Sequence, residues 1–116
     1  MSEQVYWILE GTVSDLDSWK ALLEEMVAAT RNEPGALNYE WTVGADGATC
    51  HLFERYADSD AAMVHLGNFG KNFARRFTSL LKTTRFTVYG SPNEAVKKAL
   101  GPMGVTFMTP IGGFSR

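Results

Sequence analysis

The sequence predicts an α+β fold in which helices cover one face of an antiparallel sheet. The prediction depends on segments with strand-like alternation, segments with helical spacing of apolar residues, and clear junctions between them. Pro34-Gly35 ends a helix before a strand, and Asp58-Ser59-Asp60 ends a strand before a helix. Strands are predicted over 5–13, 37–43, 49–56 and 84–89, and helices over 16–27, from 58 onward and over 71–82.

The first strand and the first helix have the strongest patterns. Residues 5–13 are apolar on both faces, with Trp7 on one and Tyr6 on the other, which is typical of a central strand. Ser14 or Asp15 is placed to cap the helix that follows. The apolar stripe of this amphipathic helix is Leu16, Trp19, Leu22, Leu23, Met26 and Val27.

The middle of the chain predicts a hairpin and then an interrupted helix. Residues 44–47, Gly-Ala-Asp-Gly, form the expected turn between the second and third strands. The helix that starts at Asp58 is predicted to falter near Gly67 and Gly70, before a second helical segment over 71–82.

The last segment, 91–116, predicts a short helix and a fifth strand. Ser91 is expected to cap that helix, with Pro92 in its first turn and Glu94 completing a capping box. Residues 105–109 are the expected strand, followed by a loose tail.

The element order up to the fourth strand is β-α-β-β-α-β, which is the ferredoxin-like arrangement. Residues 1–116 are expected to form one domain, with a core over about 5–90 and an elaboration over 91–116. Helices on one face leave the other face of the sheet uncovered, and that face is not clearly polar. A second copy of the chain is the expected cover, so a homodimer is predicted.

Composition narrows the functional classes. The 116 residues have a net charge of −2, so a general attraction to nucleic acid is not expected. A single cysteine, Cys50, precludes an intrachain disulfide and favours a reducing compartment. Without a visible secretory signal or an apolar run of ~20 residues, the expected location is the cytoplasm, with no membrane association. Two histidines and one cysteine predict no metal site.

Two stretches in register resemble a known family. Glu33-Pro34-Gly35 followed by Leu37, Tyr39 and Glu40 is similar to its helix-to-strand signature. The strand-to-helix signature corresponds to Glu54-Arg55-Tyr56, Asp58, Ala61 and His65-Leu66. The family is the antibiotic biosynthesis monooxygenase domain, and the resemblance covers about residues 5–90. It implies a ferredoxin-like dimeric α/β barrel, with two sheets packed face to face.

The resemblance also implies a reaction. Some members oxygenate aromatic polyketides or quinols with O₂ and without metal or flavin, and others degrade haem. We therefore expect a cofactor-independent monooxygenase that acts on a small aromatic or quinol-type molecule and O₂, with no cofactor. A non-catalytic homodimer that binds a small ligand or a partner is the alternative. Haem degradation is a weaker one, because the first strand lacks the asparagine that haem degraders of this family use.

His65 is the main catalytic candidate, since the family often has histidine on this helix. It would act as a base or hydrogen-bond partner for a phenol, or else be a structurally bonded histidine. Asn68 could orient a substrate oxygen or O₂, or simply end the helix. Tyr39 and Trp41 share one strand face, where they could stack on a flat substrate or pack beneath the first helix.

Two charged residues complete the set of candidates. Arg76 could bind an anionic substrate, although a solvated helix face is the simpler reading. Glu54 lies in a strand, where a buried carboxylate could take a proton, but pairing with an arginine is the expected arrangement.

Overall fold

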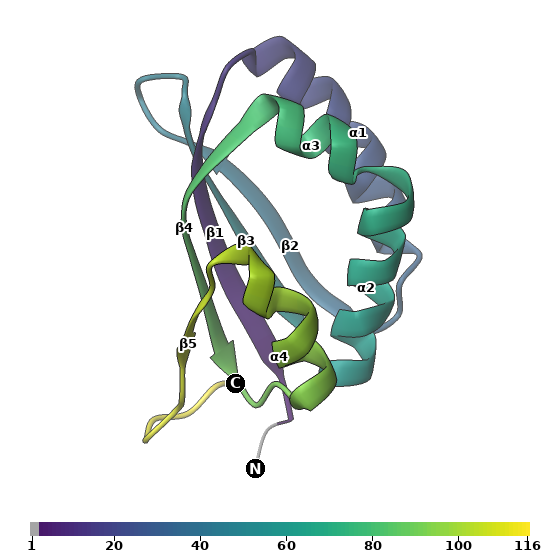
Figure 1. The fold of residues 1–116 in the computed structure, drawn as a ribbon, viewed down its shortest axis with the longest axis vertical. Coiled ribbons are helices and arrows are strands. Elements are labelled where there is room, and N and C mark those ends of the chain that lie inside the picture. Colours follow the sequence, from purple (N-terminus) through teal and green to yellow (C-terminus); the bar gives the residue numbers. More distant parts are fainter. Residues whose placement is uncertain (1–2) are drawn as a thin grey trace.

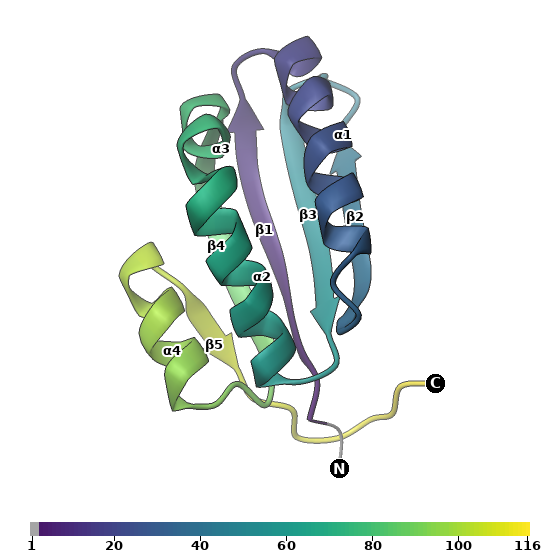
Figure 2. The same cartoon turned by 90° about the vertical axis from the view of Figure 1, so that its right-hand side faces the viewer.

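The computed structural model describes residues 3–116. Its sheet has the order β2-β3-β1-β4-β5, and all neighbouring strands are antiparallel except β4 and β5. The helices α1, α2 and α3 lie on one face of this sheet (Figures 1 and 2). The predicted ferredoxin-like α+β fold is therefore confirmed. The bounds are β1 Val5–Val13, α1 Leu16–Arg31, β2 Ala36–Val43, β3 Thr49–Tyr56, α2 Ser59–Asn72, α3 Ala74–Leu80, β4 Leu81–Gly90, α4 Glu94–Leu100, a 3-10 turn η1 Gly101–Met103, and β5 Thr106–Met108.

The core lies between the helices and the sheet. Burial alternates along the central strand β1, so that Val5, Trp7 and Leu9 are buried while Tyr6 and Ile8 are only partly covered. This alternation follows from the two-residue period of a strand. Trp7 pairs in register with Glu54 of β3, so an indole and a carboxylate are neighbours on the face that the helices cover.

Side-chain caps begin the first two helices. The Asp15 carboxylate accepts a hydrogen bond from the Ser18 backbone N–H at 3.2 Å, so Asp15 rather than Ser14 is the cap of α1. Asp58 does the same for α2 by accepting from the Ala61 N–H at 2.8 Å. The second cap fixes where α2 begins, and thereby where His65 lies along it.

The predicted weakening of α2 at its glycines is wrong. The helix continues through Gly67 and Gly70, and the break comes at Phe73, before α3. A glycine costs roughly 1 kcal/mol in a helix. Burial of Ala62 and His65 against the sheet provides the tertiary packing that outweighs this cost.

The expected Ser91 cap is also wrong. The cap of α4 is Asn93, whose side chain accepts from the Val96 N–H at 3.0 Å. The Asn93 N–H in turn donates to the hydroxyl of Ser59 at 2.9 Å, which ties the start of α4 to the start of α2. Val96 and Leu100 of α4 are fully buried, so this segment is joined firmly to the core.

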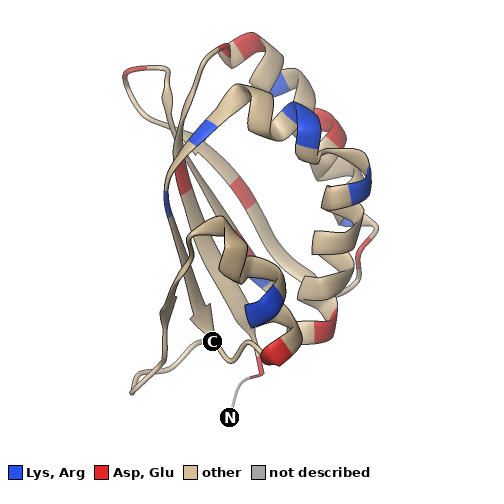
Figure 3. Ribbon diagram, in the orientation of Figure 1, with Lys and Arg blue, Asp and Glu red and all other residues tan. Residues whose placement is uncertain are grey.

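Charged residues of both signs are spread over the helices and the sheet (Figure 3). Within residues 3–116, no helix has the length and apolar character needed to cross a membrane.

Gly35, which lies between α1 and β2, packs closely against Ala61 of α2. A methyl group at this position would overlap the Cβ of Ala61. We therefore expect Gly35→Ala to lower the free energy of unfolding by about 1–3 kcal/mol, as overpacking does. Gly67→Ala is the matched control, because nothing lies near its added methyl group. It should raise stability by about 0.5–1 kcal/mol. Urea unfolding of both variants measures the difference, and equal stabilities would contradict the close-packing explanation.

Candidate active site

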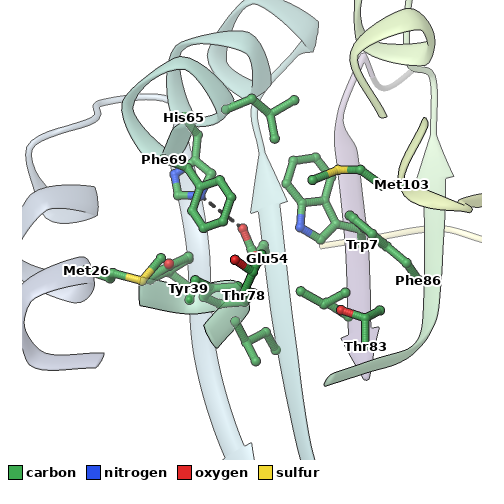
Figure 4. Close-up of a pocket in the computed structure, with 14 residues that line it drawn as sticks. Trp7, Met26, Tyr39, Glu54, His65, Phe69, Thr78, Thr83, Phe86 and Met103 are labelled. Carbon is green, nitrogen blue, oxygen red and sulfur yellow. Dashed lines mark ion pairs between the residues drawn. The ribbon is translucent and has the colours of Figure 1, made fainter. Parts of the chain in front are cut away.

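A pocket of about 100 Å³ lies between the helices and the helix-facing side of the sheet. Most of its wall is apolar or aromatic. Glu54 and His65 supply the ionisable groups on the side of β3 and α2 (Figure 4). Among the residues that line it in the described chain there is no lysine or arginine. The apolar wall includes Trp7, Leu52, Phe69, Phe77, Phe86 and Met103.

His65 is held between two buried carboxylates. Its Nδ1 lies 2.9 Å from Oε1 of Glu33, and its Nε2 lies 3.3 Å from Oε1 of Glu54. The three side chains are at most 8% exposed. They come from the α1–β2 junction, α2 and β3, so the long-range fold is what assembles them.

Further donors complete this network. The Tyr56 hydroxyl donates to Oε1 of Glu54 at 2.7 Å, and the Asn68 amide donates to Oε2 of Glu33 at 3.3 Å. Oε1 of Glu54 thus faces both Tyr56 and His65. Oε2 of Glu54 has no hydrogen-bond partner among residues 3–116, although Glu54 lines the pocket.

The pKa shifts determine which groups can hold protons. Burial alone would lower the pKa of His65, but the carboxylates of Glu54 and Glu33 outweigh it and raise the pKa above its usual 6.5. Burial, reinforced by the charge of Glu54, raises the pKa of both Tyr39 and Tyr56 above 10. The tyrosines therefore stay protonated at neutral pH, and His65 holds its second proton more tightly than a free histidine does. Oε2 of Glu54, which has no hydrogen-bond partner among residues 3–116, is the acceptor left open to a ligand.

The two aromatic candidates have different positions. Tyr39 lines the pocket, and its ring centroid lies 5.3 Å from that of His65. Trp41 instead packs at 4.7 Å from Trp19 of α1 and at 6.1 Å from Phe77 of α3. Trp41 thus packs beneath the first helix, which was the alternative to stacking on a substrate.

Asn68 and Arg76 lie outside the pocket wall. Asn68 is exposed and reaches Glu33, so it contacts the proton-bearing network from the solvent side. Arg76 forms an ion pair with Glu25, with Nη1 3.0 Å from Oε1, and both side chains are about half exposed. The structure therefore brings His65 and Tyr39 together at the pocket and leaves Trp41, Asn68 and Arg76 out of it.

Two acidic residues, Glu54 and Glu33, have a larger part in the site than the sequence indicated, because both contact His65. Glu54 pairs with His65 and Tyr56, and not with an arginine; its neighbour Arg55 donates to Asn38 and Gln4. Glu33 was predicted only as part of a junction. The sequence offered one sign of a further role for Glu33. It stands directly before Pro34-Gly35, where a turn alone does not require a carboxylate.

The described residues contain no group of three or more His, Cys, Asp and Glu side chains arranged to hold a metal ion. Glu33 and Glu54 instead contact the two ring nitrogens of His65.

Comparisons with known proteins identify relatives of this chain. The family model described as antibiotic biosynthesis monooxygenase matches residues 14–75. Rv0793 from Mycobacterium tuberculosis is 31% identical, with a TM-score of 0.63 over 79% of this chain and 98% of that one. No curated protein sequence matches.

Two further solved structures extend the likeness. MupZ from Pseudomonas fluorescens is 26% identical, with a TM-score of 0.84 over 100% of this chain and 91% of that one. SnoaB from Streptomyces nogalater, described as a cofactor-independent oxygenase, is 15% identical, with a TM-score of 0.68 over 79% and 96%. At that identity SnoaB shares the fold alone.

Proposed function

The chain belongs to the antibiotic biosynthesis monooxygenase family, and we propose that it oxidises a small phenol or quinol with O₂ and without a cofactor. One observation supports this most: the unpartnered oxygen of Glu54 borders an aromatic pocket next to His65. A carboxylate in an apolar, water-poor pocket is suited to accept a proton. The description of SnoaB as a cofactor-independent oxygenase adds support at the level of the family.

In the proposed first step, Oε2 of Glu54 takes the proton of a phenolic hydroxyl. Nε2 of His65 and the hydroxyl of Tyr56 contact the other oxygen of the same carboxylate. They fix its orientation, while Glu33 holds the far nitrogen of His65. His65 is thus a positioning residue in this proposal, and Glu54 is the base. Tyr39 and the aromatic wall would hold the ring of the substrate.

In the proposed second step, the electron-rich anion reacts with O₂ directly. A ring carbon forms a bond to one oxygen atom, and the terminal oxygen takes a proton to give a hydroperoxide. The same carbon then loses its remaining hydrogen as a proton while the O–O bond breaks. One oxygen remains as a carbonyl, and the other combines with the released proton and leaves as water. For an anthrone methylene the substrate provides all four electrons, so that no outside reductant is required.

Oxygen consumption with a panel of quinols and anthrones tests the proposal. Turnover should be saturable and should produce one carbonyl per O₂ consumed, with one ¹⁸O atom from ¹⁸O₂ in the product. Binding of these compounds without O₂ consumption would reject the proposal and favour a non-catalytic ligand-binding domain. The cavity itself supports a role in binding, because the protein's own side chains leave it open.

We also propose that the protein is a homodimer that buries the helix-free face of the sheet. The rings of Tyr6 and Tyr89 stack there at 5.3 Å, with Ile8 beside Tyr6 along β1. Phe114 and Ile111 of the C-terminal tail are exposed and border the hollow on this face. Apolar surface of this kind favours association with a second copy.

Light scattering at micromolar concentration should give a mass near twice 12.8 kDa. We expect Ile8→Lys to produce the monomer, because it places a charge in the interface. Val64→Lys is the control, since Val64 is exposed on α2 and outside this face. A monomeric wild-type protein would reject the dimer, and a dimer that survives Ile8→Lys would place the interface elsewhere.

A further inference from the structure

Trp7 lies beside the proposed base and is so far explained only by packing. It is 2% exposed and pairs in register with Glu54, and both side chains line the pocket. Its ring contacts Tyr56 at a centroid distance of 4.9 Å and Phe86 at 6.0 Å. Those contacts account for the ring but not for its nitrogen.

The indole nitrogen of Trp7 is an unused donor. Within residues 3–116, its Nε1–H donates no hydrogen bond. The polar side-chain atoms that are both sealed from solvent and unpartnered in the described chain are the Tyr39 hydroxyl and Nε1 of Trp41. Nε1 of Trp7 is not one of them, and Figure 4 shows it on the edge of the ring turned toward Glu54. It therefore opens into the pocket.

Trp7 and Glu54 together form a donor and an acceptor next to each other. Both are on adjacent strands of the rigid sheet, so their separation is fixed by the β1–β3 pairing. A hydroxyl group can use both at once, since its hydrogen can reach Oε2 of Glu54 while its oxygen accepts from the indole. Because this donor is open to the pocket, a ligand oxygen can take the place of water as its partner.

We propose that Trp7 is a substrate-binding residue whose Nε1–H donates to the oxygen of the same hydroxyl that Glu54 deprotonates. The inference rests on the proposed function in one respect, that the ligand is a hydroxyl-bearing aromatic ring. When the proton moves to Glu54, the oxygen becomes an anion and the hydrogen bond from Trp7 strengthens. His65 is the basic side chain among the described lining residues and is engaged by Glu33 and Glu54, so the hydrogen bond from Trp7 is a direct contact that stabilises the anion.

Three single-ring ligands distinguish the contribution of the Trp7 donor to binding from that of the Glu54 acceptor. Phenol can engage both groups, anisole can accept from Trp7 but cannot donate to Glu54, and toluene can do neither. Single rings are the smallest aromatic probes of this kind, which suits a pocket of about 100 Å³. Binding is followed by NMR of the ¹⁵N-labelled indoles, in which the Trp7 signal is identified as the one missing from Trp7→Phe.

In the wild type we expect phenol and anisole to move the Trp7 indole proton downfield, and toluene to leave it nearly in place. Trp7→Phe should weaken the binding of phenol and of anisole about 3- to 10-fold, which is the effect of one net hydrogen bond. The affinity for toluene should change less than about twofold. Trp19→Phe is the matched control. Trp19 is 3% exposed and does not line the pocket, so its variant should retain the preference for phenol.

Several results would overturn the proposal. One is a Trp7 indole shift that is no larger with phenol than with toluene, and another is an equal loss of all three ligands in Trp7→Phe. Absence of binding by every ligand would do the same. The wild-type shift remains decisive if Trp7→Phe does not fold. A phenol-specific shift without O₂ consumption would support the role of Trp7 while rejecting the monooxygenase activity.

Discussion

Replacing Glu54 by glutamine is expected to lower kcat for quinol oxidation by a factor of about 10²–10⁴, the usual contribution of a general base. Glutamine has nearly the same shape and can still accept from Tyr56. It has no basic oxygen toward the pocket, so the proton of the substrate has no acceptor. The measurement is the initial rate of O₂ consumption at saturating substrate, together with KM. KM should change much less than kcat, because the aromatic wall that holds the ring is unaltered.

The matched control is an exposed glutamate outside both the pocket and the proposed dimer face. Glu25 of α1 pairs with Arg76 of α3, and both side chains are about half exposed. Glu25→Gln should leave kcat within about twofold. If Glu54→Gln retained the wild-type rate, the proton would have another acceptor and the proposed chemistry would have to be abandoned.

Replacing His65 by glutamine is expected to cost about 3–5 kcal/mol in the free energy of unfolding near pH 6. The reason is that removal of one partner from a buried ion pair leaves uncompensated charge, here the carboxylates of Glu33 and Glu54. Urea unfolding provides the measurement. Arg76→Gln is the control, because its pair with Glu25 lies on the exposed surface of the helices and should contribute little to stability.

This stability difference should also depend on pH, with a defined sign. The pKa of His65 is raised above 6.5 in the folded protein, so the folded state binds the proton more tightly than the unfolded state. The contribution is fully present below 6.5 and is lost as pH rises through the raised pKa. The wild type and His65→Gln should therefore approach each other in stability at alkaline pH. A gap that widens with rising pH would contradict a charged His65.

The order of the strands and helices could be predicted because it depends on local patterns. Alternation, helical spacing and breaks such as Pro34-Gly35 are written in neighbouring residues. The path of α2 through Gly67 and Gly70 could not be predicted in this way. Its stability comes from packing against the sheet, which brings together residues that are distant in the sequence.

One residue of the candidate site, His65, could be selected from the sequence, but the residues that contact it could not. His65 could be selected because histidine is rare in this chain and the family resemblance places one on this helix. Its contact with Glu33 spans 32 positions, and no local pattern reports such a pairing. Glu54 has an arginine directly after it in the sequence, yet the alternation of the strand directs Arg55 to the opposite face. The face of the sheet on which each side chain lies depends on the fold, and it determines that Glu54 pairs with His65 and not with Arg55.

Met103 of η1 forms part of the pocket wall whose proton-handling residues occur much earlier in the chain. During synthesis, Glu33, Glu54 and His65 therefore leave the ribosome well before the segment that covers their pocket. Until α4 and η1 have docked, this part of the wall is missing. The pocket is thus complete only when residues 94–103 have joined the sheet and helices that precede them in the chain.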